Sequence, residues 1–145
     1  MNKPMRAIPT ILLLALAAAC GPPQAGSLTP YHGTLRSSCA PHDAPSVELQ
    51  LASLTGPETM YFNLWPSTPV RPPTTVRFDA LHPTGAATVC VAGGDCEAAE
   101  WGDVQLSSSG QDASVTGKWT IGLAGGRILQ GAFEADWLAI QAFCG

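Results

Sequence analysis

The chain has 145 residues, 46% of them hydrophobic, which is enough for one domain with a real core but too few for two. Eleven carboxylates outnumber seven lysines and arginines, and the formal net charge is −4. Such a balance offers no basic surface for nucleic acid and no electrostatic attraction to an anionic membrane.

The first twenty residues have the pattern of a secretory signal. Lys3 and Arg6 give a basic start, residues 11–16 are apolar, and three alanines precede Cys20. The apolar run is too short to span a bilayer. The sequence of residues 16–20 resembles the lipobox of bacterial lipoproteins. This resemblance implies cleavage after residue 19, a diacylglycerol on the Cys20 thiol and an acyl chain such as palmitate on its new amine. An ordinary signal peptide with a chance cysteine is the alternative.

Residues 20–30 follow as a lipidated cysteine and a tether rich in proline and glycine. These residue types disfavour sheet pairing, so we expect an extended segment that holds the domain within about 30 Å of the lipid. Gly21 stands where enterobacterial lipoproteins carry the aspartate of inner-membrane retention, so the resemblance implies the outer membrane. The lipid chains would then anchor the protein durably.

From Tyr31 onward the hydrophobic period is two, which is typical of β-strands. Strands are predicted over residues 46–52, 60–65, 75–80, 86–91 and 103–107. In the first of these, Val47, Leu49 and Leu51 share one face. Only residues 97–101 have a helical composition, for about one turn.

The clearest pair of strands comes last. Residues 114–123 and 128–137 both alternate, and Gly125 and Gly126 between them suit the positive φ of a tight turn. Residues 138–144 are expected either to continue the last strand or to turn into its neighbour. The strands together predict one all-β domain over residues 31–145, a small antiparallel sandwich or barrel.

Four further cysteines are an even number, as expected for disulfides in an oxidising compartment. Three connectivities are open. We predict Cys90–Cys96, around a glycine-containing reversal, and Cys39–Cys144, which would join the start of the domain to its last strand. A zinc site is the alternative, but no CxxC pair is present and no histidine has zinc spacing.

Three histidines are candidate general bases for an envelope hydrolase. His42 and His82 adjoin prolines and are expected in solvated loops, and no Gly-x-Ser-x-Gly elbow accompanies them or His32. We therefore expect no catalytic residue and no cofactor.

Four carboxylates cluster in the sequence and could suggest calcium. Their spacing does not fit an EF-hand loop, so we expect no metal but a solvated acidic edge that keeps a strand from pairing with other molecules. The residues are Asp95, Glu97, Glu100 and Asp103.

The most distinctive loop covers residues 65–73, where four prolines follow or flank Trp65 and Arg71. The prolines should give this segment a polyproline II shape at modest ordering cost. Tryptophan and arginine are favoured anchors in protein interfaces, so we predict that Trp65 and Arg71 bind a partner. A stiff connection with Trp65 folded into the core is the alternative.

The end of the chain resembles that of uncharacterised small bacterial lipoproteins. Gly131-Ala132-Phe133-Glu134-Ala135 and the late Cys144 match a Gly-x-Phe-x-Ala strand and a last cysteine that close a β domain in those proteins. The resemblance implies the fold and carries no activity.

The sequence thus predicts an acylated, disulfide-stapled β domain of the bacterial cell envelope that acts as a binding or structural module. Its partners would be the lipid membrane, through Cys20, and an envelope protein. The binding face would combine the 65–73 loop with the neighbouring acidic edge. A small-ligand carrier with a barrel cavity and an envelope hydrolase are the alternatives.

Overall fold

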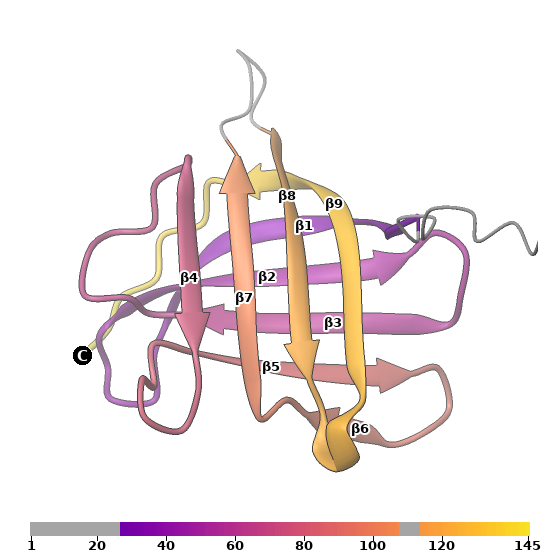
Figure 1. Ribbon diagram of the computed structural model, residues 1–145. Coiled ribbons are helices and arrows are strands. Elements are labelled where there is room, and N and C mark those ends of the chain that lie inside the picture. The colour runs from indigo at the N-terminus through magenta and orange to yellow at the C-terminus, as the bar shows by residue number, and fades with distance from the viewer. Residues whose placement is uncertain (1–26, 108–113) are drawn as a thin grey trace, which may run out of the picture.

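A computed structural model describes residues 27–107 and 114–145 of the chain. Nine strands form a single sheet that curls into a half-barrel (Figure 1). The strands are β1 (Thr29–Cys39), β2 (Pro45–Ser53), β3 (Glu58–Leu64), β4 (Thr74–Phe78), β5 (Gly85–Val91), β6 (Cys96–Ala98), β7 (Trp101–Ser107), β8 (Ser114–Gly122) and β9 (Ile128–Leu138). One short 3-10 turn, Ala124–Gly126, connects β8 to β9.

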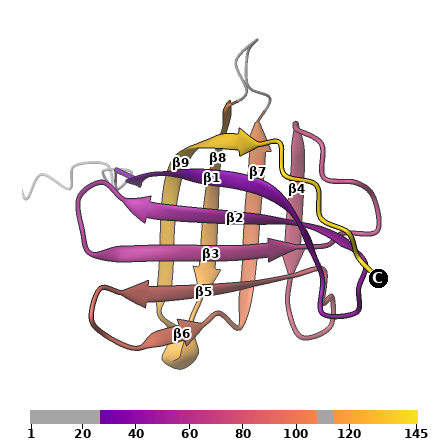
Figure 2. The ribbon, with the colours of Figure 1, turned by 180° about the vertical axis from the view of Figure 1, so that it is seen from behind.

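The order of strands in the sheet is β4-β7-β8-β9-β1-β2-β3-β5-β6. One layer contains β4, β7, β8 and β9 (Figure 1), and the strands of the other layer, β1, β2, β3 and β5, run across it (Figure 2). Strand β1 joins the layers because it pairs with β2 on one side and β9 on the other. The predicted all-β class is therefore confirmed. One pairing differs from the prediction, since β1 and β9 are parallel while all other neighbours are antiparallel.

The core lies between the two layers. Alternation places every second residue inside, and Val47, Leu49 and Leu51, predicted to share one face, are all buried. Trp119 of β8 occupies the centre, with its ring centroid 5.1 Å from that of Tyr31 and 5.8 Å from that of Phe62. These three aromatic residues come from both layers and so fasten them together. Aromatic pairs of this kind contribute about 0.5–1.5 kcal/mol beyond the area that they bury.

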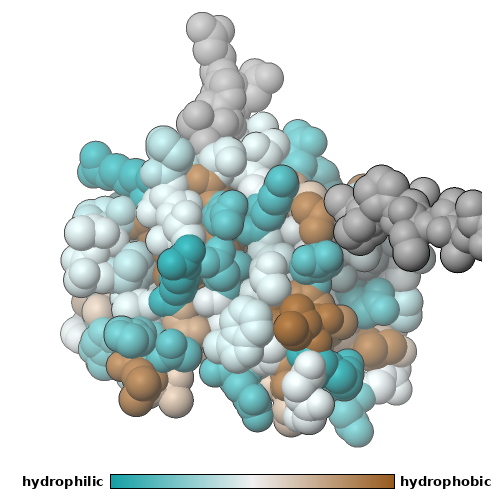
Figure 3. Space-filling view, viewed as in Figure 1, coloured by the Kyte–Doolittle hydropathy of each residue, from teal (hydrophilic) through white to brown (hydrophobic). Residues whose placement is uncertain are grey.

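The outer face of the β4-β7-β8-β9 layer is mostly hydrophilic, with apolar residues in small separate spots (Figure 3). An ion pair between Arg77 of β4 and Asp103 of β7 crosses it, with 2.6 Å between the charged atoms. Alternation along these strands thus gives a half-buried sheet with one solvated face.

Three predicted strand boundaries and one predicted helical turn need correction. β1 begins at Thr29, two residues inside the expected tether, and the Pro30 carbonyl accepts the N–H of Leu54 at 3.0 Å. Residues 97–101 form no helical turn. The chain reverses after β5, so that Cys96 pairs with Cys90 and β6 is hydrogen-bonded antiparallel to β5. β4 ends at Phe78, two residues before its predicted end at residue 80. β9 ends at Leu138, so residues 139–145 neither continue that strand nor form another one.

Both predicted disulfides are present. Cys90 and Cys96 bridge β5 and β6 around Gly93, whose φ of 73° suits a reversal. Cys39 and Cys144 join the end of β1 to the C-terminal tail rather than to a strand, with Cα atoms 5.6 Å apart. Because 105 residues separate these cysteines, this disulfide is expected to stabilise the fold more than Cys90–Cys96 does. The chain-entropy model gives a stabilisation of about 4–5 kcal/mol.

Gly33 allows β1 to make its bend between the two layers. A Cβ atom built on Gly33 would overlap the backbone carbonyl oxygen of Gln50 on β2. Because that oxygen belongs to a paired strand, it cannot move aside without disturbing the ladder. Glycine is often found where a strand bends at a barrel corner and backbones approach closely.

Gly33→Ala should therefore lower the free energy of unfolding by about 1–3 kcal/mol, as overpacking does elsewhere. Urea denaturation followed by tryptophan fluorescence measures this change. Gly94→Ala is the matched control, because its added Cβ would meet nothing closer than 3.4 Å. If the two variants were equally stable, β1 and β2 would not approach at Gly33 as described.

Candidate functional site

A groove opens at the end of the half-barrel where β1, β3 and β9 finish and β2 begins. It has a volume of about 450 Å³. It is lined by Ser37, His42, residues 44–47, residues 65–70 and Trp137. Ligand sites are often found in the mouths of β-barrels, and this volume is within the usual range for them.

The groove is uncharged and rich in aromatic and proline side chains. None of its lining residues is a lysine, arginine, aspartate or glutamate. Trp65 and Trp137 supply two indoles, and the His42 ring lies edge-on to Trp65 with 6.3 Å between centroids. A site of this composition favours an apolar ligand over an ion.

Trp65 is held in place by the segment before β5. Its backbone N–H donates to the Thr84 carbonyl oxygen at 2.8 Å, and its indole Nε1–H donates to the Pro83 carbonyl oxygen at 2.5 Å. The side chain is half-buried and is not part of the main hydrophobic core. The indole therefore has a fixed orientation before any ligand arrives, which lowers the ordering cost of binding.

Ser46 lines the groove and has a buried hydroxyl without a partner. This residue of β2 is 7% exposed, and its Oγ is buried with no hydrogen-bond partner among the described residues. Leaving a buried polar group unpaired costs about 1–3 kcal/mol.

The structure separates the two predicted binding residues. Trp65 lines the groove, whereas Arg71 is exposed and is not among the lining residues. Within residues 27–107 and 114–145, Arg71 forms no ion pair.

Sequence reasoning missed His42 and Trp137 as groove residues. Trp137 is the last residue of the alternating strand predicted over residues 128–137, but nothing in the sequence shows that this strand ends beside the 65–73 loop. His42 lies in the turn between β1 and β2 and lines the groove. No local pattern in the sequence indicates that this turn packs beside residues 65–70.

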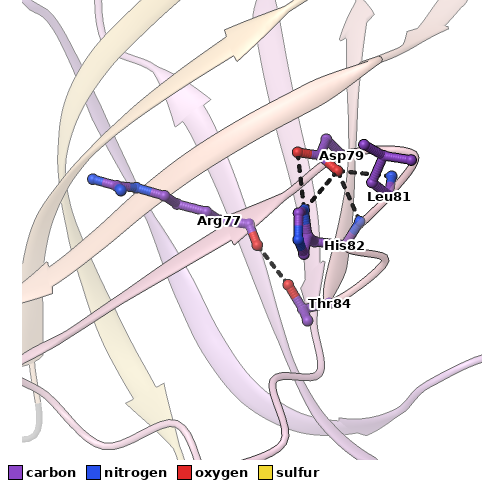
Figure 4. Close-up of polar contacts among 5 residues, drawn as sticks. All are labelled: Arg77, Asp79, Leu81, His82 and Thr84. Atoms are coloured by element: carbon purple, nitrogen blue, oxygen red, sulfur yellow. Dashed lines mark hydrogen bonds and ion pairs between the residues drawn. The ribbon is translucent and has the colours of Figure 1, made fainter.

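The candidate hydrolase residues do not form a catalytic arrangement around His82. The Asp79 carboxylate accepts the backbone N–H groups of Leu81 and His82, both at 2.7 Å, and lies 3.2 Å from His82 Nδ1 (Figure 4). The nearby Thr84 hydroxyl donates to the Arg77 carbonyl oxygen and is not directed at the imidazole. This geometry is a hydrogen-bonded turn that ends β4.

The same contacts lower the pKa of Asp79. The backbone N–H of His82 has the largest effect, followed by that of Leu81, because both stabilise the ionised carboxylate. A lowered pKa means that the turn gains stability above the ordinary aspartate pKa and loses it as the pH falls through the lowered value.

The other two histidines are apart from this turn. His32 is exposed on β1, and His42 contacts Trp65 in the groove. In the part of the chain that the structure describes, no serine hydroxyl is hydrogen-bonded to a histidine. The hydrolase alternative therefore has no assembled nucleophile and base among these residues.

The four clustered carboxylates are not beside the groove, so the expected combined binding face is wrong. Glu97 pairs with Arg127 at 2.9 Å, and Asp103 pairs with Arg77. Asp95 and Glu97 line a different cavity at the opposite end of the sheet. No group of three or more histidine, cysteine or acidic side chains gathers as metal ligands within the described ranges.

Cys20 and the expected signal lie outside the described residues. Among the residues that are described, no helix has the length and hydropathy needed to cross a membrane. Comparisons with protein-family models, with curated proteins and with solved structures found no match to this chain.

Ser46→Ala tests whether the groove hydroxyl is unpartnered in the free protein. We expect its free energy of unfolding to change by less than about 0.5 kcal/mol, because no hydrogen bond is lost. Ser53→Ala is the matched control, since Ser53 Oγ accepts the N–H groups of Thr55 and Gly56. That variant should lose about 1 kcal/mol in urea denaturation. An equal loss in both variants would mean that Ser46 already has a partner.

Proposed function

We propose that this protein is a bacterial envelope lipoprotein, held in the outer membrane through acylated Cys20, whose groove binds an extended, uncharged segment of another envelope protein. The observation that carries the proposal is the position of the groove relative to the start of the domain. The groove is at one end of β1, and the segment that bears Cys20 joins the other end.

The length of β1 determines how far the groove lies from the segment that bears Cys20. The strand has 11 residues, from Thr29 to Cys39, and so extends roughly 35 Å. Ser37, near its far end, lines the groove. A lipid attached ahead of Thr29 would leave the groove facing away from the membrane surface and open to a partner.

The chemistry of the groove favours a peptide. Aromatic-lined grooves bind extended proline-containing segments, because such segments are already ordered in the polyproline II conformation. Charged segments would bind less well, since no lining residue compensates for the loss of their hydration.

The C-terminal tail extends the apolar surface at this end. Cys144 is bonded to Cys39, and the neighbouring Ile140 and Phe143 are 52% and 87% exposed. Exposed apolar groups gathered in one region commonly mark a protein interface. A binding role rather than catalysis is therefore the function that these residues support.

The lipid anchor predicts a defined mass change. Intact natively expressed protein should begin at Cys20 and carry the added mass of a diacylglyceryl group and an acyl chain, and it should partition into detergent. Cys20→Ser should lose both properties while keeping the loss of four hydrogens that two disulfides cause. An unmodified wild-type chain in the aqueous phase would contradict the proposed anchor.

The groove predicts a specific set of mutational effects on peptide binding. We would measure fluorescence anisotropy for a library of uncharged proline-containing decapeptides, with a charged library as the comparison. Trp65→Ala should weaken binding about 30-fold, the effect of a typical interface hot spot of about 2 kcal/mol.

Two variants serve as controls. Arg71→Ala, outside the lining, should change the Kd less than about twofold, as should Trp101→Ala, an exposed tryptophan at the start of β7. Absence of any binding peptide, or binding that Trp65→Ala leaves intact, would refute the groove assignment even if the lipid anchor were present.

A further inference from the structure

The turn between β4 and β5, residues 79–84, supplies two hydrogen-bond acceptors that hold Trp65. The Pro83 carbonyl oxygen accepts the indole N–H at 2.5 Å, and the Thr84 carbonyl oxygen accepts the backbone N–H at 2.8 Å. Neither Pro83 nor Thr84 lines the groove, so both affect it only through Trp65. The orientation of the indole in the groove therefore depends on the shape of this turn.

Packing does little to determine that shape. Residues 79–83 are all exposed, and none of them belongs to the hydrophobic core. An exposed segment with few apolar contacts depends on its hydrogen bonds to keep one conformation. The polar contacts of the turn thus determine where the Pro83 carbonyl oxygen points.

Asp79 makes several of these contacts (Figure 4). Its Oδ1 accepts the backbone N–H groups of Leu81 and His82, both at 2.7 Å. Its own backbone N–H donates to the His82 carbonyl oxygen at 3.2 Å, and the same oxygen accepts the N–H of Thr84 at 2.8 Å. The Asp79 side chain is therefore bonded directly to the two residues that precede Pro83.

Thr84 fixes the other side of Pro83. Its hydroxyl donates to the Arg77 carbonyl oxygen on β4, so the end of the turn is tied back to its beginning (Figure 4). The proline ring restricts φ to about −65°. Because both neighbours are held and its own φ is restricted, Pro83 has little freedom to turn its carbonyl oxygen away from the indole.

We propose that Asp79 is a positioning residue of the groove: its carboxylate shapes the 79–84 turn, and the turn holds the Trp65 indole in its binding orientation. This inference rests on the proposed function of the groove. Asp79 is not among the lining residues and does not contact a ligand there. Its effect passes through the Pro83 carbonyl oxygen to the indole N–H.

The same hydrogen bond determines what Trp65 offers to a peptide. Because Nε1–H is already donated to Pro83, the indole has no polar hydrogen left for a peptide carbonyl oxygen. It contributes the apolar surface of its ring, against which a proline ring can pack. The prolines of the peptide, rather than its backbone carbonyls, are thus the groups that Trp65 recognises.

The rate at which the Trp65 indole N–H exchanges with solvent tests this role in the free protein. Two-dimensional NMR resolves the indole signals of the four tryptophans, and Trp65→Phe identifies the signal of Trp65. In Asp79→Ala the exchange rate should rise about tenfold, because two hydrogen bonds that fix the turn are lost. In Asp79→Asn, whose amide oxygen can accept the same two bonds, the rate should stay within about threefold of wild type.

Two controls separate positioning from a general loss of stability. Asp95→Ala removes an exposed carboxylate from the β5–β6 connection and should leave the Trp65 rate unchanged. The Trp119 signal reports on the core, where that residue is 2% exposed, and its rate should not change in these variants. An unaltered Trp65 rate in Asp79→Ala, or equal acceleration of the Trp65 and Trp119 signals, would overturn the proposal. Acceleration in Asp79→Asn as large as that in Asp79→Ala would overturn it too.

Peptide binding then connects the turn to the groove. For a peptide selected from the uncharged proline-containing library, Asp79→Ala should weaken the Kd about fivefold, since the indole must then be ordered on binding. Asp79→Asn should stay within about twofold of wild type, because it keeps the acceptor oxygen. Faster exchange in Asp79→Ala with an unchanged Kd would overturn the role of Asp79 in binding. If no peptide binds the wild type, the proposed function fails, whereas the exchange rates still decide whether Asp79 positions Trp65.

Discussion

The double pairing of β1 is the constraint on which the rest of the structure depends. This strand is hydrogen-bonded to β2 in one layer and to β9 in the other, so it turns two crossed layers into one curled sheet. The bend brings Tyr31 of β1 against Trp119, and the core forms around that contact. A close backbone approach at Gly33 makes the bend feasible. The half-barrel thus arises from one strand that belongs to both layers.

The two ends of β1 also separate two chemically different surfaces. The groove at the Cys39 end is uncharged and carries indoles and prolines, while the cavity at the Thr29 end is lined by Glu58, Asp95, Glu97 and Arg127. Ser46 and Trp119 each have a buried polar atom, Oγ and Nε1, that has no hydrogen-bond partner among the described residues. Native proteins satisfy most such atoms, so these two are exceptions to the usual pattern.

Local patterns in the sequence predicted most of the strands but not their arrangement. The alternation of Val47, Leu49 and Leu51 shows which face is buried, because the period of a strand is local. The parallel pairing of β1 with β9 depends on residues far apart in the chain, and no local signal specifies it. Contacts between distant segments also determine which residues line the groove. Trp65 lies in a distinctive local segment and can be identified from it, whereas the position of Trp137 beside that segment cannot. For the same reason the sequence does not show that the acidic residues lie away from the 65–73 loop. The cysteine pairs were predictable because parity and a glycine reversal restrict the choices.

The neighbouring positions of the first and last strands affect how the chain folds. On one side, the hydrogen-bonded neighbour of β1 is β9, the last strand of the sheet. The curled sheet therefore cannot close until nearly the whole chain is available. Contacts between such distant segments slow folding, because the intervening chain must first lose much of its entropy. A chain threaded through a membrane from its N-terminus would therefore have an incomplete sheet during passage. It would complete its sheet, and the Cys39–Cys144 bond, only after the C-terminus had crossed.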